Sequence, residues 1–156
     1  MKNNIKYFIM DVDGTLTDGK IYMGTSSEFC KTFNIKDGYG IHDILIPAGI
    51  TPVIMTGRRS EIVLNRCKEL GITEVYQDIS NKTEQLQFIV EDLSTVAYIG
   101  DDLNDYSCML SIKNAGGLIG CPKDADKKII KIVNYVAKHN GGNGAVRDFI
   151  EWIFEG

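Results

Sequence analysis

The sequence predicts an α/β domain in which helices flank a parallel β-sheet. Short apolar runs alternate along the chain with segments whose apolar residues recur at helical spacing. Several of these runs lack a strict polar–apolar alternation, which is typical of parallel strands buried on both faces. The succession of strand and helix favours a parallel sheet, because parallel neighbours need a crossover connection. The length of 156 residues is that of one domain, so we expect a single domain over residues 1–156.

Five apolar segments are expected to form the strands: Ile5–Met10, Thr51–Met55, Val75–Tyr76, Val96–Ile99 and Gly117–Ile119. Three segments are expected to form helices with one apolar face each: Ser60–Leu70, Lys82–Asp92 and Gly144–Phe154. Gly71 is suited to end the first helix, because glycine tolerates the left-handed conformation that follows many helices. The apolar faces of the three helices consist of Val63, Cys67 and Leu70, of Leu86, Ile89, Val90 and Leu93, and of Val146, Phe149, Ile150 and Ile153.

Residues 20–35 interrupt this alternation. The extended pieces "KIYM" and "FCKTFNI" flank a polar "GTSSE", which predicts a β-hairpin insertion over about residues 19–35, after the first strand. An isolated hairpin is only marginally stable in water. This hairpin carries more apolar residues than an exposed one should, so we expect it to pack against equivalent hairpins in a homotetramer. The apolar residues are Ile21, Tyr22, Met23, Phe29 and Phe33.

The composition argues against several classes of function. The net charge is −4 and no basic stripe is visible, so nucleic acid is not an expected partner. The apolar runs are too short to cross a bilayer and the N-terminus lacks a signal-peptide pattern, so we expect a cytoplasmic protein without a membrane partner. The four cysteines form no CxxC pair and only two histidines are present, so reduced thiols are expected and structural zinc is not.

The stretch "MDVDGTLTDG", residues 10–19, places Asp11 and Asp13 directly behind the first apolar run. Two neighbouring carboxylates repel each other and are costly to desolvate, so a positive group should neutralise them. A calcium loop of the EF-hand type is excluded, because that pattern wants an acid or amide at its fifth position, glycine at its sixth and glutamate at its twelfth. Those positions here hold Thr15, Leu16 and Tyr22.

Two further polar segments follow predicted strands. Thr56-Gly57 comes after Thr51–Met55, and "GDDLND", residues 100–105, comes after Val96–Ile99. The carboxyl ends of parallel strands meet at one edge of a sheet, so Asp11, Asp13, Asp101 and Asp105 should converge there. Carboxylates with waters and a phosphate oxygen suit Mg²⁺, and Lys82 brings a further positive charge.

The motifs "DVDGT", "TGR", "SNK" and "GDDLND", in this order, resemble the four motifs of the haloacid-dehalogenase superfamily of phosphotransferases. The resemblance covers nearly the whole chain. It implies a Rossmann-like fold without a large cap domain, since the intervals after the first and second motifs have room only for a hairpin and for one helix with one strand. It also implies a Mg²⁺-dependent phosphatase that works through an aspartyl phosphate.

The resemblance assigns a role to each matching residue. Asp11 would be the nucleophile, and Asp13 would protonate the leaving oxygen and then activate water. Mg²⁺ would be held by Asp11, Asp101 and the backbone carbonyl of Asp13. The remaining roles are phosphate binding by Thr56 and Gly57, pairing with phosphate and Asp11 by Lys82, and support of the metal ligands by Asp105. The role of Asp102 stays open, with helix capping as an alternative.

Two readings from other classes stay open. A receiver domain of a two-component system also combines an acid pair, a phosphorylatable aspartate, a threonine and a lysine, but there the lysine comes last in the chain. Here Lys82 precedes the second acidic cluster. A catalytically idle copy that serves as an oligomerisation domain is the other alternative, and the complete set of motif side chains argues against it.

Longer segments resemble the 3-deoxy-D-manno-octulosonate 8-phosphate phosphatases more closely. These segments are "KIYM…GTSSEFCKTFNIKDGYGI", "IMTGRRSEIVLNRCKELGI", "VYQDISNK", "YIGDDLNDYSCM" and "GGNGAVRDFIEWI". The resemblance implies a tetramer whose hairpins cover neighbouring sites, and a 2-keto-3-deoxy acid sugar phosphate as substrate, in lipopolysaccharide biosynthesis. Related chains act on nine-carbon sialic-type acid 9-phosphates or form a domain of sialate cytidylyltransferases, and this alternative stays open.

Arginines follow the second motif and suit the carboxylate of an acid sugar. We expect Arg58 and Arg66 to bind substrate and Arg59 to be solvated, whereas Arg147 matches the family with either a structural or a functional role. Many octulosonate phosphatases continue past the last helix into a tail that helps to close a neighbour's site. This sequence ends at Gly156, which leaves open how the site is closed and whether the sugar has eight or nine carbons.

Overall fold

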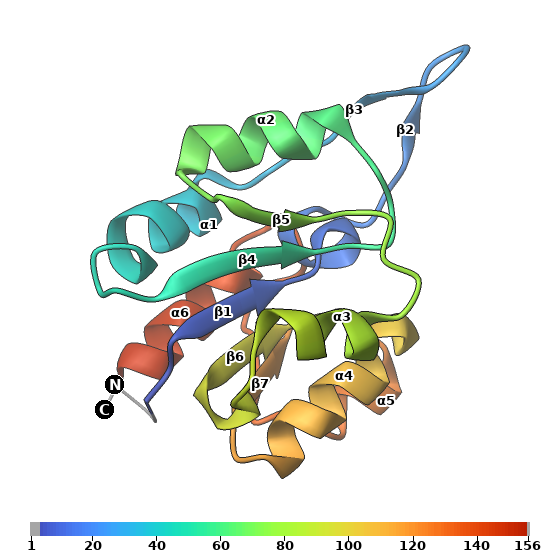
Figure 1. Cartoon of the computed structure of the whole chain (residues 1–156). Helices are drawn as coiled ribbons and strands as arrows, with labels where there is room; N and C mark the ends of the chain where they lie inside the picture. Colours follow the sequence, from blue (N-terminus) through green and yellow to red (C-terminus); the bar gives the residue numbers. More distant parts are fainter. Residues whose placement is uncertain (1–3, 156) are drawn as a thin grey trace.

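A computed structural model describes residues 4–155, which are built around a six-stranded parallel sheet (Figure 1). The strand order is β5-β4-β1-β6-β7-β8. The predicted α/β class is confirmed, and each predicted strand is present. The strands are β1 (Tyr7–Met10), β4 (Thr51–Met55), β5 (Glu74–Tyr76), β6 (Val96–Ile99), β7 (Leu118–Cys121) and β8 (Tyr135–Val136).

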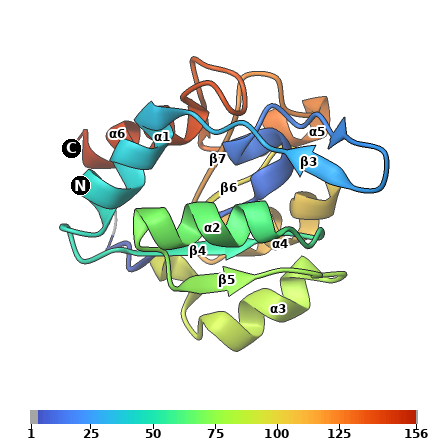
Figure 2. The same ribbon diagram turned by 90° about the horizontal axis from the view of Figure 1, so that it is seen from above.

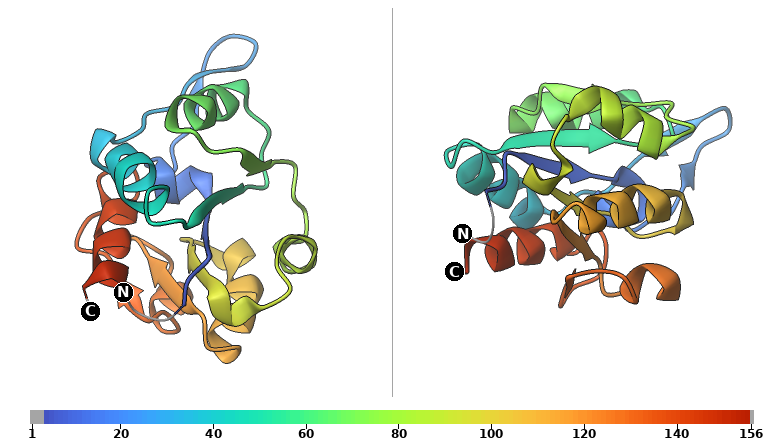
Figure 3. Two further views of the ribbon diagram at one scale, coloured as in Figure 1. Left: turned by 60° about the vertical axis from the view of Figure 1, so that its left-hand side comes forward. Right: turned by 60° about the horizontal axis from the view of Figure 1, so that its bottom comes forward.

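Helices cover both faces of this sheet. The left view of Figure 3 shows α1, α2 and α6 along one side and α3 and α4 along the other. Figure 2 shows α1 beside α6, seen from above. The helical segments are α1 (Ile35–Tyr39), η2 (Gly40–Leu45), α2 (Glu61–Leu70), α3 (Lys82–Ile89), η3 (Leu93–Thr95), α4 (Leu103–Asn114), α5 (Lys127–Ile130) and α6 (Ala145–Phe154).

The two faces of the sheet carry two separate clusters of buried apolar side chains. In β1, Phe8 and Met10 pack with α2 and α6, whereas Ile9 packs on the other face with α3 and α4. Successive side chains of a strand point to opposite faces. Because both faces are covered, the strands are apolar at nearly every position, which explains why the sequence shows continuous apolar runs there.

One predicted helix is shorter than expected. α3 ends at Ile89 rather than Asp92, because Val90 has extended backbone angles (φ −136°, ψ 128°). Asp92 then caps η3 by accepting a hydrogen bond from the Ser94 N–H at 3.0 Å. The apolar face predicted for Lys82–Asp92 is therefore shared between a helix and the turn that follows it.

The predicted insertion forms a short hairpin of β2 (Tyr22–Met23) and β3 (Glu28–Cys30), which pair antiparallel. It projects away from the sheet (Figure 1). Met23 is 61% exposed and Phe29 is 67% exposed, whereas Phe33 is partly buried against the core. No described helix is long and apolar enough to cross a membrane.

Candidate functional site

The three central strands end in polar residues at one edge of the sheet. Asp11 follows β1, Thr56 follows β4, and Asp101 lies two residues beyond β6. Because β1 pairs with both β4 and β6, these three strand ends are neighbours. Carboxylate oxygens of Asp11, Asp101 and Asp105 lie within 4.8 Å of one another. The structure therefore brings together aspartates that are about 90 residues apart in sequence.

The turn after Asp11, η1 (Val12–Leu16), fits closely against Asp101. Gly14 has φ +92°, and a Cβ at this position would lie 2.1 Å from Asp101 Oδ2, so position 14 requires glycine for two reasons. The Thr15 hydroxyl donates to Asp101 Oδ1 at 3.0 Å. The Thr17 hydroxyl oxygen accepts from the N–H groups of Gly14 and Gly19. The segment "DGTLT", residues 13–17, thus forms a turn that orients Asp101.

Lys82, the first residue of α3, bridges two of the acids. Its Nζ donates to Asp11 Oδ1 at 2.8 Å and to Asp105 Oδ1 at 2.7 Å, and all three side chains are buried. Asp105 also accepts from the Tyr98 hydroxyl at 2.6 Å and from the Asp101 backbone N–H at 3.0 Å. Asp105 therefore fixes the lysine and the Asp101 backbone together.

The cluster contains more acid than Lys82 compensates. Burial, followed by the charge of Asp105, raises the pKa of Asp11 to about 6 although Lys82 opposes this shift. Burial, followed by the charges of Asp11 and Asp105, raises the pKa of Asp101 to about 8. Burial alone would lower the pKa of Lys82, but the two neighbouring carboxylates raise it. Such a set of crowded hard oxygen ligands fits Mg²⁺, which would remove this penalty on the ionised acids.

The acids open into a polar cleft of about 330 Å³. Thr56 lies in its wall, and its backbone is held by hydrogen bonds to Tyr76 and Ile79. Asp102 caps α4 in a reciprocal capping box with Asp105, which is the capping role considered from the sequence, and it also lines the cleft. The residues that line the cleft are Asp11, Asp13, Gly19, Thr56, Gly57, Arg58, Asp101, Asp102 and Asn104.

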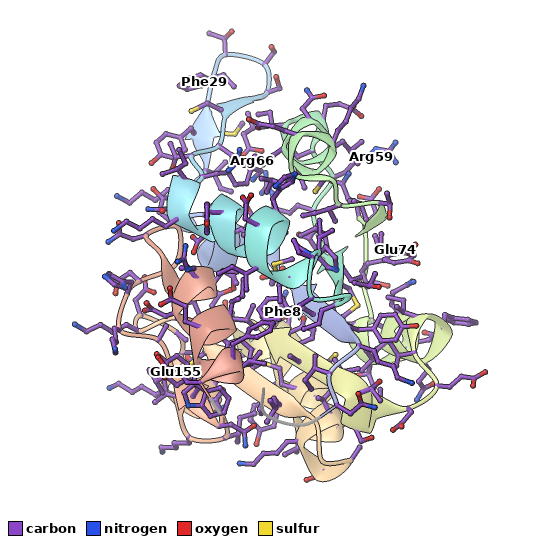
Figure 4. The ribbon with its side chains drawn as sticks, turned by 90° about the vertical axis from the view of Figure 1, so that its left-hand side faces the viewer. Phe8, Phe29, Arg59, Arg66, Glu74 and Glu155 are labelled. Carbon is purple, nitrogen blue, oxygen red and sulfur yellow. The ribbon has the colours of Figure 1, made fainter. Side chains whose placement is uncertain are left out.

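The two arginines expected to bind substrate lie in different places. Arg58 lines the cleft, with its Nε 4.0 Å from Asp13 Oδ2. Arg66 does not line it: Figure 4 shows Arg66 near α1 and α2, where its Nη1 donates to Glu69 at 2.8 Å and its guanidinium lies 5.8 Å from the Phe33 ring centre. The two arginines do not share a helix, because Arg58 precedes Ser60, the N-cap residue of α2, whereas Arg66 lies within α2.

The other two arginines have surface or structural positions. The side chain of Arg59 is 70% exposed and pairs with Asp78 at 3.4 Å, so the expectation of a solvated arginine is confirmed (Figure 4). Arg147 donates from Nε to Glu151 at 2.7 Å and lies 5.0 Å from the Tyr39 ring centre. Its backbone N–H donates to the buried Asp37, so Arg147 joins α6 to α1.

Sequence reasoning missed two charged residues of the hairpin. Lys31 pairs with Asp13 and with Glu28, and all three side chains are largely buried. The signal in the sequence is the lysine in "FCKTF": a charged residue among apolar neighbours of a strand implies an acidic partner. The partner itself could not be read from the sequence, because Asp13 lies 18 positions away on another element.

Comparisons with known proteins agree on one family, although no protein-family model matches the chain. A 3-deoxy-D-manno-octulosonate 8-phosphate phosphatase from Escherichia coli K12 is 44% identical in an alignment of length 154 that covers 96% of this chain and 79% of that protein. The Moraxella catarrhalis phosphatase of the same name was crystallised with magnesium, phosphate and KDO, the acid sugar. It superposes with a TM-score of 0.90 at 36% identity, over 98% of this chain and 87% of that one.

A third relative is the cobalt-bound deoxy-D-mannose-octulosonate 8-phosphate phosphatase from Haemophilus influenzae. It also superposes with a TM-score of 0.90, at 32% identity, and the match covers 97% of this chain and 88% of that one.

Proposed function

The chain belongs to the 3-deoxy-D-manno-octulosonate 8-phosphate phosphatases of the haloacid-dehalogenase superfamily, and on this premise we propose that it hydrolyses a 2-keto-3-deoxy acid sugar phosphate through an aspartyl phosphate. As a member of this family it is a phosphoric monoester hydrolase, and Mg²⁺ is its cofactor. The observation that carries the proposed mechanism is Asp11, held by Lys82 and open to the cleft beside Asp101.

In the first step an oxygen of Asp11 attacks phosphorus, and the bond from phosphorus to the sugar oxygen breaks. Asp13, in the same cleft, gives its proton to the leaving oxygen. In the second step Asp13 takes a proton from water as the water oxygen attacks phosphorus, and the bond to Asp11 breaks. Each step is an in-line displacement, so attacking and leaving oxygens need separate sides of the phosphoryl group.

The other side chains orient the phosphoryl group and balance its charge. The Thr56 hydroxyl and the Gly57 N–H, both in the cleft wall, would donate to phosphoryl oxygens. Lys82 keeps Asp11 ionised and oriented, and Asp105 holds Lys82. Asp11, Asp101 and the Asp13 carbonyl would hold Mg²⁺, which would neutralise the repulsion between the carboxylate and the phosphate.

Arg58 is our candidate for the carboxylate of the sugar. Its side chain is 49% exposed at the cleft, beside Asp13 and Glu28, and a guanidinium can bind a carboxylate through two parallel hydrogen bonds. Arg66 lies outside the cleft of its own chain and would reach a substrate only across a subunit boundary. The KDO-bound relative favours the eight-carbon sugar, and a nine-carbon sialic-type acid 9-phosphate is the alternative with the same chemistry.

The setting follows from the same proposal. Release of the free eight-carbon acid sugar would serve lipopolysaccharide biosynthesis in the cytoplasm. A homotetramer would cover the exposed apolar side chains of the hairpin, Met23 and Phe29 among them. Neither a receiver module nor an idle copy is retained, because a receiver has another motif order and an idle copy has no need of the buried Lys82 bridge.

A panel of phosphorylated acid sugars with Mg²⁺ tests the substrate. Arg58→Ala should lower kcat/KM for octulosonate 8-phosphate tenfold or more, about 1.4 kcal/mol, and should barely affect p-nitrophenyl phosphate, which has no carboxylate. Arg59→Ala, at the exposed neighbouring position, is the matched control. Equal losses on both substrates would contradict the role of Arg58. Asp11→Asn should abolish turnover of all substrates, and near wild-type activity would contradict the mechanism.

A further inference from the structure

Lys31, in the hairpin insertion, contacts Asp13, one of the residues that line the cleft. Its Nζ contacts Asp13 Oδ1 and, at 2.9 Å, Glu28 Oε1. The lysine side chain is only 1% exposed, against 19% for Asp13 and 11% for Glu28. Lys31 and Glu28 do not line the cleft. The lysine therefore touches the carboxyl group proposed as general acid without facing the space that substrate occupies.

The contacts close into a ring of two acids and two bases. Glu28 Oε2 lies 3.8 Å from Arg58 Nη2, and Arg58 Nε lies 4.0 Å from Asp13 Oδ2. Asp13 thus has the lysine in contact with Oδ1, whereas Oδ2 lies beyond hydrogen-bond distance of Arg58. An ammonium group has no lone pair, so the oxygen that Lys31 occupies is a poor place for a proton.

A buried lysine is held in place by these partners and is not a loosely attached surface group. Burial alone would lower the pKa of Lys31, but hydrogen bonds and charges of Asp13 and Glu28 raise it. Taking a lysine out of water is unfavourable unless good partners compensate, so the arrangement defines one geometry for the three side chains. Glu28 belongs to the same hairpin as Lys31, whereas Asp13 lies on another element. The contact with Lys31 therefore orients the Asp13 side chain relative to the hairpin.

We propose that Lys31 is a positioning residue that fixes Asp13 by its Oδ1, so that Oδ2 carries the transferred proton and faces the leaving oxygen, with Glu28 fixing the lysine. In the first step a proton passes from Oδ2 to the sugar oxygen as the P–O bond breaks, and it leaves with the sugar. In the second step Oδ2 takes a new proton from the attacking water as the bond from phosphorus to Asp11 breaks. This inference rests on the proposed role of Asp13.

The test compares kcat/KM for phosphate esters with leaving groups of graded basicity. A 2,4-dinitrophenolate leaves without a proton, whereas phenolate and alkoxide leaving groups need one. Lys31→Met keeps the apolar stem and should lower kcat/KM for phenyl phosphate and octulosonate 8-phosphate about 100-fold, as expected for a misplaced general acid. For 2,4-dinitrophenyl phosphate the loss should stay below about threefold.

Controls separate positioning from a general structural effect. Asp13→Asn should show the same dependence on the leaving group, and the double variant should lose no more than Asp13→Asn alone, because both changes remove one function. Lys20→Met removes an exposed lysine of the same insertion and should change neither substrate class. Circular dichroism and melting of each variant report whether it folds.

The outcomes distinguish a failure of the role of Lys31 from a failure of the proposed role of Asp13. Equal losses with good and poor leaving groups in Lys31→Met, or additive losses in the double variant, overturn the inference. An Asp13→Asn variant without leaving-group dependence overturns the proposed acid instead. If Lys31→Met does not fold, Glu28→Gln keeps the lysine and removes the negative charge of its second partner. The kcat/KM of Glu28→Gln should fall about tenfold for esters with poor leaving groups only, because the general acid is partly misplaced. An equal fall for good and poor leaving groups would overturn the inference.

Discussion

Lys82→Met should destabilise the metal-free protein strongly at pH 8. The lysine Nζ lies 2.8 Å from Asp11 and 2.7 Å from Asp105, in a site where these side chains are at most 6% exposed. At an effective dielectric constant of about 20, each contact corresponds to about 6 kcal/mol of gross Coulomb attraction. Desolvation of the three charges offsets much of this, and removing one partner of a buried ion pair typically costs about 3–5 kcal/mol.

For a chain of this size, about 1 kcal/mol shifts the melting temperature by about 2–4 °C. We therefore expect Lys82→Met to melt about 6–20 °C below wild type in thermal unfolding at pH 8 with EDTA. Burial already raises the pKa of Asp11 to about 6 and that of Asp101 to about 8. Both acids are protonated at low pH. The difference in melting temperature between wild type and Lys82→Met should therefore become smaller as the pH falls from 8 to 5. Added Mg²⁺ should narrow it as well.

A second variant separates charge from packing. Lys82→Met combined with Asp105→Asn removes one negative charge together with the positive one, so it should recover part of the lost stability at pH 8. Lys36→Met, at an exposed position of α1, is the control for loss of a lysine. A Lys82→Met variant that melts within about 2 °C of wild type at pH 8 would refute the electrostatic account, since that corresponds to less than about 1 kcal/mol.

Three further predictions concern the metal, a buried acid and assembly. EDTA should abolish phosphate release and Mg²⁺ should restore it, whereas Ca²⁺ should bind but support little turnover because its looser shell misplaces Asp11; full activity in excess chelator would contradict the metal role of Asp101. Burial raises the pKa of Asp37 to about 6, above its unfolded value, so ionisation of Asp37 should reduce the free energy of unfolding by about 3 kcal/mol as the pH rises from about 4 to above 6. Asp37→Asn should lack that part of the pH dependence in urea unfolding, and identical profiles would show that Asp37 ionises freely. Light scattering should give the mass of a tetramer at micromolar concentration, and a monomer would refute the role assigned to the exposed hairpin.

Local sequence patterns predicted most of the sheet and the helices next to it. Val146, Phe149, Ile150 and Ile153 recur at helical spacing and are all buried in α6. α4 was not predicted from its spacing, because its buried face begins with Asp105, which belongs to the site rather than to the apolar pattern. β8 has only two residues and offers no period to read.

The position of the acids could be derived from topology alone. A parallel sheet places all strand ends of one kind at one edge, so residues that follow β1, β4 and β6 must be neighbours if those strands are adjacent. Adjacency itself came from the tertiary structure, where β1 lies between β4 and β6. The acids at those ends are thus local features of the sequence, and their separation of less than 4.8 Å is a property of the fold.

By itself, the sequence determined which residues carry chemistry and in which order, since strand ends, caps and motif turns depend on neighbours along the chain. Apart from the pair of Lys82 with Asp11, which the family resemblance implied, only the tertiary structure decided which charges pair. Lys31, which follows β3, pairs with Asp13 in η1. Arg58 lies at the cleft before α2 begins, whereas Arg66 lies within α2 and outside the cleft. An ion pair between separate elements depends on the path of the backbone between them and on the direction in which each side chain points. A local sequence pattern contains neither piece of information.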